Sequence, residues 1–287
     1  MTAVGLALLS ALLFGAMSVG LRIGLVKYPD VELATIATVA GGLVVVLVAV
    51  IAEAPSRGVH AGAAWPFFLT GLIHPGLGMV LVILAVREAG ASRSSVAFGA
   101  APLVSVTIAL LVLGEPLSAP LLAGAVLVVA GGIELARERT RPEHVRLLGL
   151  AFALGAVVLF AVRDNLLRWL SQGTSAPPAV AAAAGLLGGT IVVAAMLGPR
   201  LRGRPVVRPS LPFLGVGVLF GLSYVALFEA YYRGRVTVVS PLIATESLWG
   251  VALSLLLIRH TELVGRRVVL GALLVVAGGV LIGLHAA

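Results

Sequence analysis

The chain has 287 residues, of which 60% are hydrophobic and only 11% are charged, and its formal net charge is +8. A soluble fold of this length cannot bury so much apolar surface, so the composition excludes a water-soluble globular protein and predicts an all-α integral membrane protein. The absence of cysteine excludes disulfides, thiolate catalysis and cysteine-ligated metal sites.

Continuous apolar runs predict ten transmembrane helices, because a helix needs about 20 apolar residues to cross the hydrocarbon core. The runs lack the period-2 alternation that a β-barrel needs. The predicted spans cover residues 2–26, 32–51, 66–86, 94–113, 120–135, 147–170, 178–197, 211–232, 236–258 and 264–284. The first is interpreted as a permanent span rather than a signal peptide, since no Lys or Arg precedes it. Pro75 lies inside the third span beside His74 and predicts a kink.

The two halves of the chain resemble each other. The segment Gly-Ala-Val-Leu-Val-Val-Ala-Gly-Gly at residues 124–132 returns 147 positions later as Gly-Ala-Leu-Leu-Val-Val-Ala-Gly-Gly at residues 271–279. Glu115 recurs as Glu262 at the same separation. A shift that recurs at separated places predicts two copies of one unit.

The repeats are predicted to cover residues 3–136 and 147–284, with residues 137–146 as a basic linker. Five spans per repeat is an odd number, so the second repeat is expected to be inverted in the membrane relative to the first. Inverted pairs commonly build a substrate site near the middle of the bilayer, between two units that move against each other.

The twin glycine-containing segments, the acidic residue that ends the preceding span (Gly114-Glu115, and Glu262 in the second copy) and the five-plus-five count resemble the EamA-type transporters of the drug/metabolite transporter superfamily. This resemblance implies a ten-helix carrier that works by alternating access, often an exporter of amino acids, metabolites or toxic compounds. The chain departs from the pattern where Thr261 replaces the glycine before Glu262, and where Trp249 stands in place of the first copy's Pro102.

The basic residues of the loops predict an orientation. The loops after the odd-numbered spans hold 14 basic residues and the other face holds four. By the positive-inside rule, the odd-numbered loops are cytoplasmic and both termini are outside. The family resemblance implies cytoplasmic termini instead, so the orientation and the direction of transport stay open.

Ionisable side chains inside spans are costly and call for a reason. Three acidic residues precede an arginine by four positions, which predicts ion pairs along one helix. The pairs are Asp164–Arg168, Glu229–Arg233 and Glu262–Arg266. Glu115 and Glu262 lie at span ends, where a solvated or helix-start carboxylate is expected.

His74, Arg163 and Glu246 have no such neighbour. A helix rises about 1.5 Å per residue, so Glu246 is expected about 15 Å into the bilayer from the start of its span. The span that carries Arg163 enters from the opposite face of the membrane, and Arg163 is expected within about 6 Å of the same depth. The sequence therefore predicts a pair between Arg163 and Glu246, with His74 in the same layer. Such a buried pair serves equally well as a rigid strut or as part of a substrate site.

Further polar and aromatic side chains complete the candidate substrate site, which suits a small amphipathic or zwitterionic solute. The candidate residues are Glu246, Arg163, Asp164, Asn165, His74, Trp249, Tyr224 and Thr245. Packing is the alternative for the aromatic residues. Six glycines, by contrast, are predicted to let helices approach closely. They are Gly124, Gly131, Gly132, Gly271, Gly278 and Gly279.

The sequence thus predicts a secondary transporter in the inner (plasma) membrane that moves a small metabolite, amino acid or amphipathic compound, as a monomer or homodimer. We expect the lipid bilayer as a partner, no nucleic acid, no cofactor and no metal, with proton coupling left open. The alternatives are a flippase for a lipid-linked substrate, an intramembrane enzyme and a non-transporting scaffold. None of the common hydrolase, metalloprotease or nucleotide-binding motifs occurs in the sequence, so we expect no enzyme.

Overall fold

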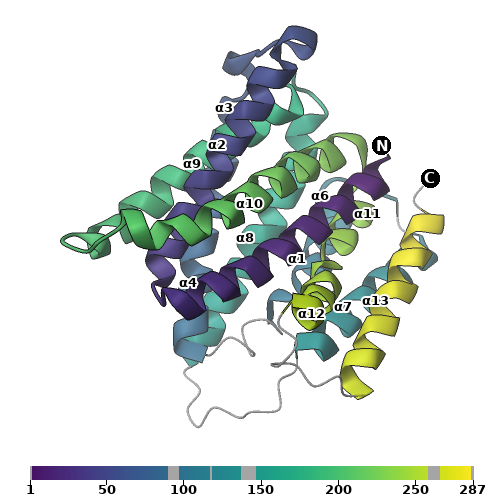
Figure 1. Ribbon diagram of the computed structural model, residues 1–287. Coiled ribbons are helices and arrows are strands. Elements are labelled where there is room, and N and C mark those ends of the chain that lie inside the picture. Colours follow the sequence, from purple (N-terminus) through teal and green to yellow (C-terminus); the bar gives the residue numbers. More distant parts are fainter. Residues whose placement is uncertain (1, 90–96, 117, 137–146, 258–265, 286–287) are drawn as a thin grey trace.

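The computed structural model describes residues 2–89, 97–116, 118–136, 147–257 and 266–285, and these residues form a bundle of helices (Figure 1). No strand occurs among them. In chain order the elements are α1 (Ala3–Lys27), α2 (Val31–Arg57), η1 (Ala61–Ala63), α3 (Trp65–Gly71), η2 (Leu72–Leu77), α4 (Gly78–Ala89), α6 (Ala101–Val112), α7 (Ala119–Ala136), α8 (Leu147–Ser171), α9 (Pro178–Leu197), η3 (Gly198–Leu201), α10 (Val207–Arg233), α11 (Val236–Ile243), α12 (Glu246–Leu257) and α13 (Arg266–Leu284).

The long helices have the length and the surface of membrane spans. Within the described residues, seven helical segments are long and apolar enough to cross a membrane, and three further apolar helices are shorter. Large apolar side chains such as Leu111 and Ile51 face outwards, where a soluble protein would place polar ones. The prediction of an all-helical, strongly apolar protein is therefore confirmed.

The first two long helices begin at side-chain caps. The Thr2 side chain accepts a hydrogen bond from the Gly5 N–H at 3.2 Å, and Asp30 accepts one from the Leu33 N–H at 3.0 Å. These bonds satisfy backbone donors that have no partner inside the helix.

The predicted kink at Pro75 is present and is larger than a simple bend. A π-helical turn, η2, separates α3 from α4, and His74 within it has extended backbone angles of φ −151° and ψ 124°. Because Pro75 cannot donate a backbone hydrogen bond, the regular helical ladder is interrupted there. The interruption places the His74 side chain inside the bundle.

The predicted span over residues 236–258 is present as a segment, Val236–Ser254, that is long and apolar enough to cross a membrane. Its helix is interrupted at Ala244–Thr245, which divides it into α11 and α12. Pro241 removes one backbone donor, and the Thr245 hydroxyl donates to the Leu242 carbonyl oxygen at 2.7 Å. Glu246 is therefore the first residue of a new helix rather than a position in mid-helix.

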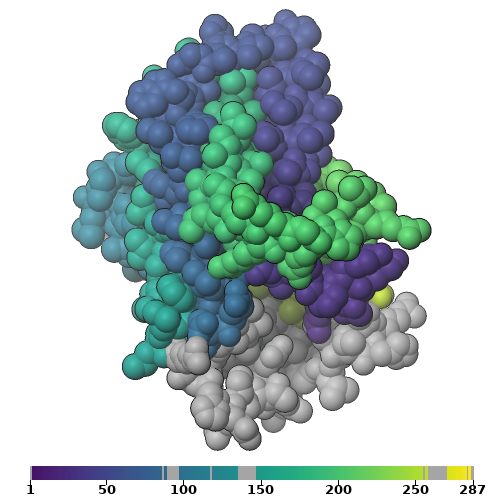
Figure 2. Space-filling view, turned by 90° about the vertical axis from the view of Figure 1, so that its left-hand side faces the viewer, coloured from purple at the N-terminus to yellow at the C-terminus, as the bar shows by residue number. Residues whose placement is uncertain are grey.

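Contacts between the two halves of the chain come in matched pairs. Helix α1 packs against α10 and α12, whereas α8 packs against α4 and α6. Helix α2 packs against α10 and α9 against α3, and Figure 2 shows the green α9–α10 region between the purple and blue segments of the first half. Each of these contacts has a counterpart with the halves exchanged.

The glycine-containing segments form the contact between α7 and α13, so their predicted role in packing is confirmed in part. A Cβ at Gly124 would lie 2.9 Å from the Gly278 carbonyl oxygen, and one at Gly131 would lie 2.6 Å from that of Gly271. Gly132 and Gly279 lie away from this contact: the nearest atom to a Cβ at Gly132 is 3.4 Å away, and at Gly279 nothing lies within 4 Å. Only the first glycine of each Gly-Gly pair is therefore needed for close approach.

Candidate functional site

Arg163 of α8 lies at the centre of a buried polar cluster. Its side chain is buried, and its Nε lies 3.0 Å from Oδ1 of Asp164. Its guanidinium also lies over the Tyr224 ring of α10, 5.8 Å from the ring centroid. Although Nε is close to the carboxylate, neither Nε nor Nη1 has a hydrogen bond in good geometry with the described residues. Nε is thus held in the ion pair with Asp164, and Nη1 is a buried donor without a hydrogen-bond partner among the described residues.

Asp164 and Asn165 tie this cluster to two other helices. Asp164 Oδ2 accepts hydrogen bonds from Ser105 Oγ of α6 at 3.4 Å and from Ser240 Oγ of α11 at 3.3 Å. Asn165 donates from Nδ2 to the Ser105 carbonyl oxygen at 3.0 Å. The carboxylate therefore joins α6, α8 and α11 inside the bundle.

His74 also contacts Tyr224. The Tyr224 hydroxyl donates to the His74 carbonyl oxygen at 3.4 Å, and the imidazole meets the Phe160 ring edge-on at 4.4 Å between centroids. His74 Nδ1 is buried and has no hydrogen-bond partner among the described residues, while Arg163 is near enough to interact with the ring electrostatically. The kink at Pro75 thus brings His74 to the Arg163 cluster.

Glu246 is near Arg163, but the predicted direct pair between them is wrong. The two side chains interact electrostatically, yet the ion pair of Arg163 within 4.0 Å is with Asp164. The physical reason is that Asp164 is the adjacent residue on the same helix and reaches the guanidinium without spanning the bundle. Glu246 consequently remains a carboxylate near, but not bound to, a buried cation.

Thr245 and Trp249 are close to Glu246 in the sequence, but their contacts in the structure are with residues outside the Arg163 cluster. The Thr245 hydroxyl is used by the helix break described above. Trp249 packs against α1, where a Cβ at Gly15 would lie 2.7 Å from the Trp249 Cβ, and its buried Nε1 has no hydrogen-bond partner in the described part of the chain.

Of the three ion pairs predicted along single helices, one is confirmed. Arg233 Nε donates to Glu229 Oε2 at 2.9 Å. The Asp164–Arg168 pair is wrong: Arg168 Nη1 instead donates to the Tyr231 carbonyl oxygen at 3.0 Å, because Asp164 faces the bundle interior. Glu262 of the third pair lies outside the described residues.

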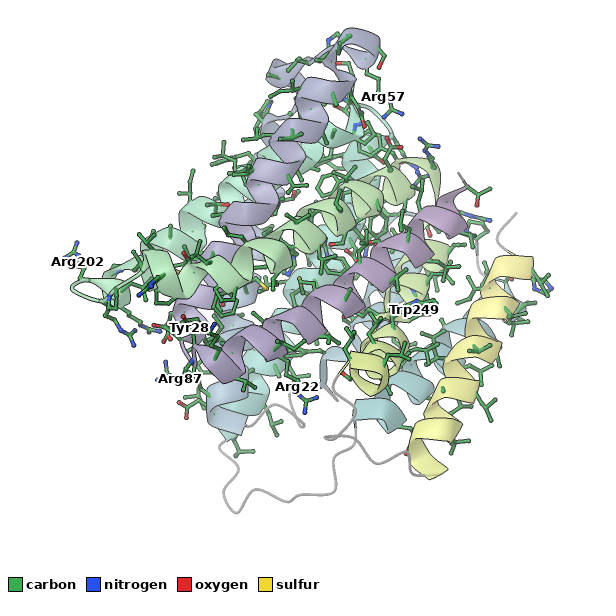
Figure 3. The ribbon with its side chains drawn as sticks, in the orientation of Figure 1. Arg22, Tyr28, Arg57, Arg87, Arg202 and Trp249 are labelled. Carbon is green, nitrogen blue, oxygen red and sulfur yellow. The ribbon has the colours of Figure 1, made fainter. Side chains whose placement is uncertain are left out.

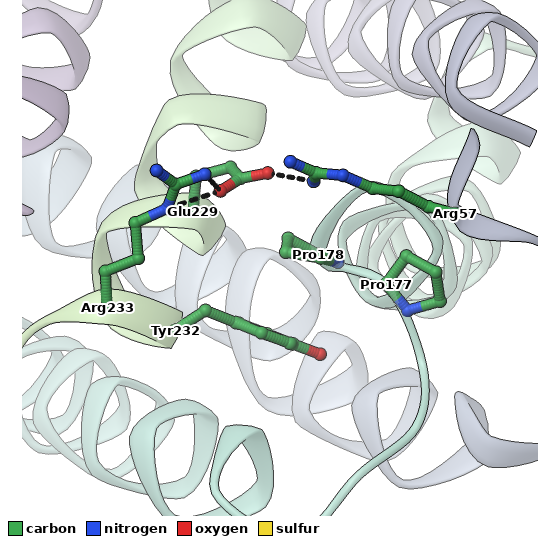
Figure 4. Close-up of a pocket in the computed structure, with 6 residues that line it drawn as sticks. All are labelled: Arg57, Pro177, Pro178, Glu229, Tyr232 and Arg233. Atoms are coloured by element: carbon green, nitrogen blue, oxygen red, sulfur yellow. Dashed lines mark hydrogen bonds and ion pairs between the residues drawn. The ribbon is translucent and has the colours of Figure 1, made fainter. Parts of the chain in front are cut away.

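A separate pocket of about 370 Å³ opens at one end of the bundle. Glu229 lies in it between Arg57 of α2 and Arg233 of α10 and is ion-paired with both, above the Tyr232 ring (Figure 4). Figure 3 shows Arg57 at this end, with Arg87 and Arg202 at the other. The pocket lies at the surface and is distinct from the Arg163 cluster.

Sequence reasoning missed Ser105, Ser240 and Tyr231. Tyr231 interacts with Asp164 and Ser240, although its hydroxyl has no hydrogen bond in good geometry in the described structure. A signal for Tyr231 was present, because it follows Tyr224 by seven residues, which is two helical turns. The serines carried no such signal, since isolated hydroxyls are common in membrane helices.

The described residues contain no group of three or more His, Asp or Glu side chains placed to hold a metal ion. The cluster consists instead of one guanidinium, two carboxylates, hydroxyls and an imidazole. This set can bind charged and hydrogen-bonding groups of a solute.

The apolar helices and the buried charged cluster define a multi-pass membrane protein. Residues 1–134 match the family described as the EamA-like transporter family. The first half of the chain therefore matches this family, and the predicted resemblance to the drug/metabolite transporter superfamily is confirmed. No curated protein matches the chain.

A solved structure described only as a crystal structure of a protein shares 20% sequence identity with the chain and aligns with a TM-score of 0.80. The match covers 99% of this chain and 97% of that one. At this identity the likeness concerns the fold alone, and it extends over both halves of the chain.

Proposed function

We propose that this protein is a secondary transporter of the inner (plasma) membrane that moves a small metabolite, amino acid or amphipathic compound, in the direction of export. In this proposal ten spans form two inverted repeats, residues 3–136 and 147–284, which rock about the Arg163 cluster. This motion opens the cluster to one side of the membrane and then to the other.

The matched contacts support the inverted repeat. If two repeats are related by a twofold axis, each contact between them must occur twice with the halves exchanged. The pairs α1–α10 with α8–α4, and α1–α12 with α8–α6, follow this rule. So does the α7–α13 contact, where Gly124 meets Gly278 and Gly131 meets Gly271, since these residues are counterparts across the repeat.

The observation that carries the proposal is the buried cluster itself, which takes residues from both halves. Among its buried residues, His74 and Ser105 come from the first half and Arg163 and Asp164 from the second. Glu246 of the second half is partly buried and lies near Arg163. Burying a charged group inside a membrane protein is costly, so a scaffold or packing role gives little reason for it. A carrier needs such groups at the junction of its moving halves.

The cluster also narrows the solute. The guanidinium of Arg163, whose Nη1 has no hydrogen-bond partner among the described residues, suits a carboxylate or phosphate group. Glu246, which makes no close ion pair with Arg163, suits an amine or, in a coupled cycle, a proton. A solute with an acidic and a basic group would satisfy both ends of the cluster.

The test begins with a thermal-shift screen of amino acids, polyamines and lipophilic cations, followed by uptake of the stabilising compound into proteoliposomes. Arg163→Ala and Glu246→Gln should each abolish uptake. Glu53→Gln, which changes a partly exposed carboxylate that pairs with Arg57 at 3.1 Å, should leave uptake unchanged. Wild-type uptake rates in both cluster variants would overturn the assignment.

A further inference from the structure

Glu115 makes an unusual contact across the two halves of the chain. Its two carboxylate oxygens accept hydrogen bonds from the backbone N–H groups of Val236 at 2.8 Å and Thr237 at 2.9 Å. These are the first two residues of α11, and the preceding Arg235 provides no side-chain cap. A first-half carboxylate thus satisfies donors at the start of a second-half helix, where an anion is also favoured by the helix dipole.

Arg168 completes this arrangement. Its Nη1 donates to the carbonyl oxygens of Tyr231 at 3.0 Å and Tyr232 at 3.4 Å, in the last turn of α10, and its charge interacts with Glu115. The connection between α10 and α11 is therefore held by a cation at the end of one helix and an anion at the start of the next. Both charges match the dipoles of the helices that they contact.

Helix α11 links Glu115 to the buried cluster. Ser240 lies four residues after Val236, about one helical turn along, and its hydroxyl donates to Asp164. The residues from Val236 to Leu242 are all buried, so the start of α11 cannot shift without moving Ser240. Asp164 is in turn the carboxylate beside Arg163.

We propose that Glu115 is a positioning residue that couples closure of its end of the protein to the geometry of the Arg163–Asp164 pair. Separation of the halves at this end breaks both bonds from Glu115 to α11, and the released helix withdraws Ser240 from Asp164. The carboxylate then has one donor fewer than in the closed arrangement. The coupling rests on the proposed carrier function, whereas the link from Glu115 to α11 can be tested without any solute.

The absence of cysteine in the chain makes the test direct, because single introduced thiols can be labelled with a membrane-permeant maleimide. Val239→Cys reports on α11 and Ala182→Cys on α9, and both native side chains are fully buried. Each is combined with Glu115→Gln, with Glu115→Asp or with the control Glu53→Gln. Labelling rates are measured in purified protein without ligand.

In the Glu115→Gln background, we expect the labelling rate at position 239 to rise about tenfold or more, because two charge-assisted bonds are lost. At position 182 the rate should stay within about twofold of the parent, because α9 does not depend on these bonds. Glu115→Asp, which keeps the charge, should restore part of the protection. Glu53→Gln should change neither rate.

An unchanged rate at position 239 would overturn the proposal. An equal rise at both positions would also overturn it, because Glu115 would then stabilise the whole fold rather than α11. The carrier assignment fails differently, by wild-type uptake in Arg163→Ala and Glu246→Gln. A positive labelling result together with unimpaired uptake in those variants would retain Glu115 as the anchor of α11 but remove its role in transport.

Discussion

The contact between α7 and α13 predicts opposite behaviour for two adjacent glycines. A Cβ at Gly278 would lie 2.6 Å from the Gly124 carbonyl oxygen and 2.8 Å from both Cγ2 and the backbone nitrogen of Val128. The next residue, Gly279, has nothing within 4 Å of its Cβ position. Gly278→Ala must therefore push two helices apart, whereas Gly279→Ala adds a methyl group in open space.

The size of the difference follows from two opposing effects. Replacing a helical glycine with alanine stabilises a helix by about 0.5–1 kcal/mol, because the unfolded chain loses freedom. Both variants gain this contribution. Overpacking costs about 1–3 kcal/mol and applies to Gly278→Ala alone. We expect Gly279→Ala to be neutral or slightly stabilising and Gly278→Ala to be less stable than it by about 1–3 kcal/mol.

The free energy of unfolding can be measured by titrating purified protein with sodium dodecyl sulfate and following helical circular dichroism. The pair Gly131→Ala and Gly132→Ala repeats the comparison on α7, where the nearest atoms to a new Cβ are 2.6 Å and 3.4 Å away. Equal stability of the two members of each pair would refute the close approach of α7 and α13.

Three further outcomes are expected. Arg163→Ala should lower the free energy of unfolding by about 3–5 kcal/mol, because it leaves the buried Asp164 unpaired, and adding Asp164→Ala should recover part of that loss in the same titration. Thr245→Val should cost about 1 kcal/mol, since it removes the bond to the Leu242 carbonyl oxygen. High salt should broaden the distance distribution between spin labels on Pro29→Cys and Arg202→Cys, which lie near the partly exposed Asp30–Arg204 pair. It should leave unchanged the distance distribution between labels on Val59→Cys and Gln172→Cys at the Glu115 end.

The features that were predictable from the sequence are those that depend on position along a helix. Apolar length located the seven long apolar helices found among the described residues, and Pro75 located the kink. The expected depth of each residue along its helix brought His74, Arg163 and Glu246 into one region. These predictions need only the rise per residue and the thickness of the bilayer. The rotation of each helix about its axis does not enter them.

The features that could not be predicted depend on that rotation. In a membrane helix both the lipid-facing and the buried side are apolar, so hydrophobic periodicity says little about which side faces the partner helices. The bond of Asp164 with Ser240 and the contact of Arg168 with the Tyr231 carbonyl were therefore not predictable. The break after Ala244 was also missed, because it depends on a side-chain bond of Thr245.

The two ends of the bundle are held by different chemistry. At the start of α2, Asp30 pairs with Arg204 at 3.1 Å and Glu32 with Arg200 at 3.6 Å, and both arginine side chains are about half exposed. Exposed pairs of this kind contribute about 0–1 kcal/mol each.

At the other end, Glu115 binds two backbone donors, and hydrogen bonds to a charged group contribute about 1.5–3 kcal/mol each. The end of α10 and the start of α11 are thus anchored more firmly than the start of α2. Among the described contacts, the polar interactions between the halves are weaker at the Asp30 end than at the Glu115 end, so the halves separate more easily at the Asp30 end. Opening at the Glu115 end requires that the hydrogen bonds from Glu115 to α11 break first.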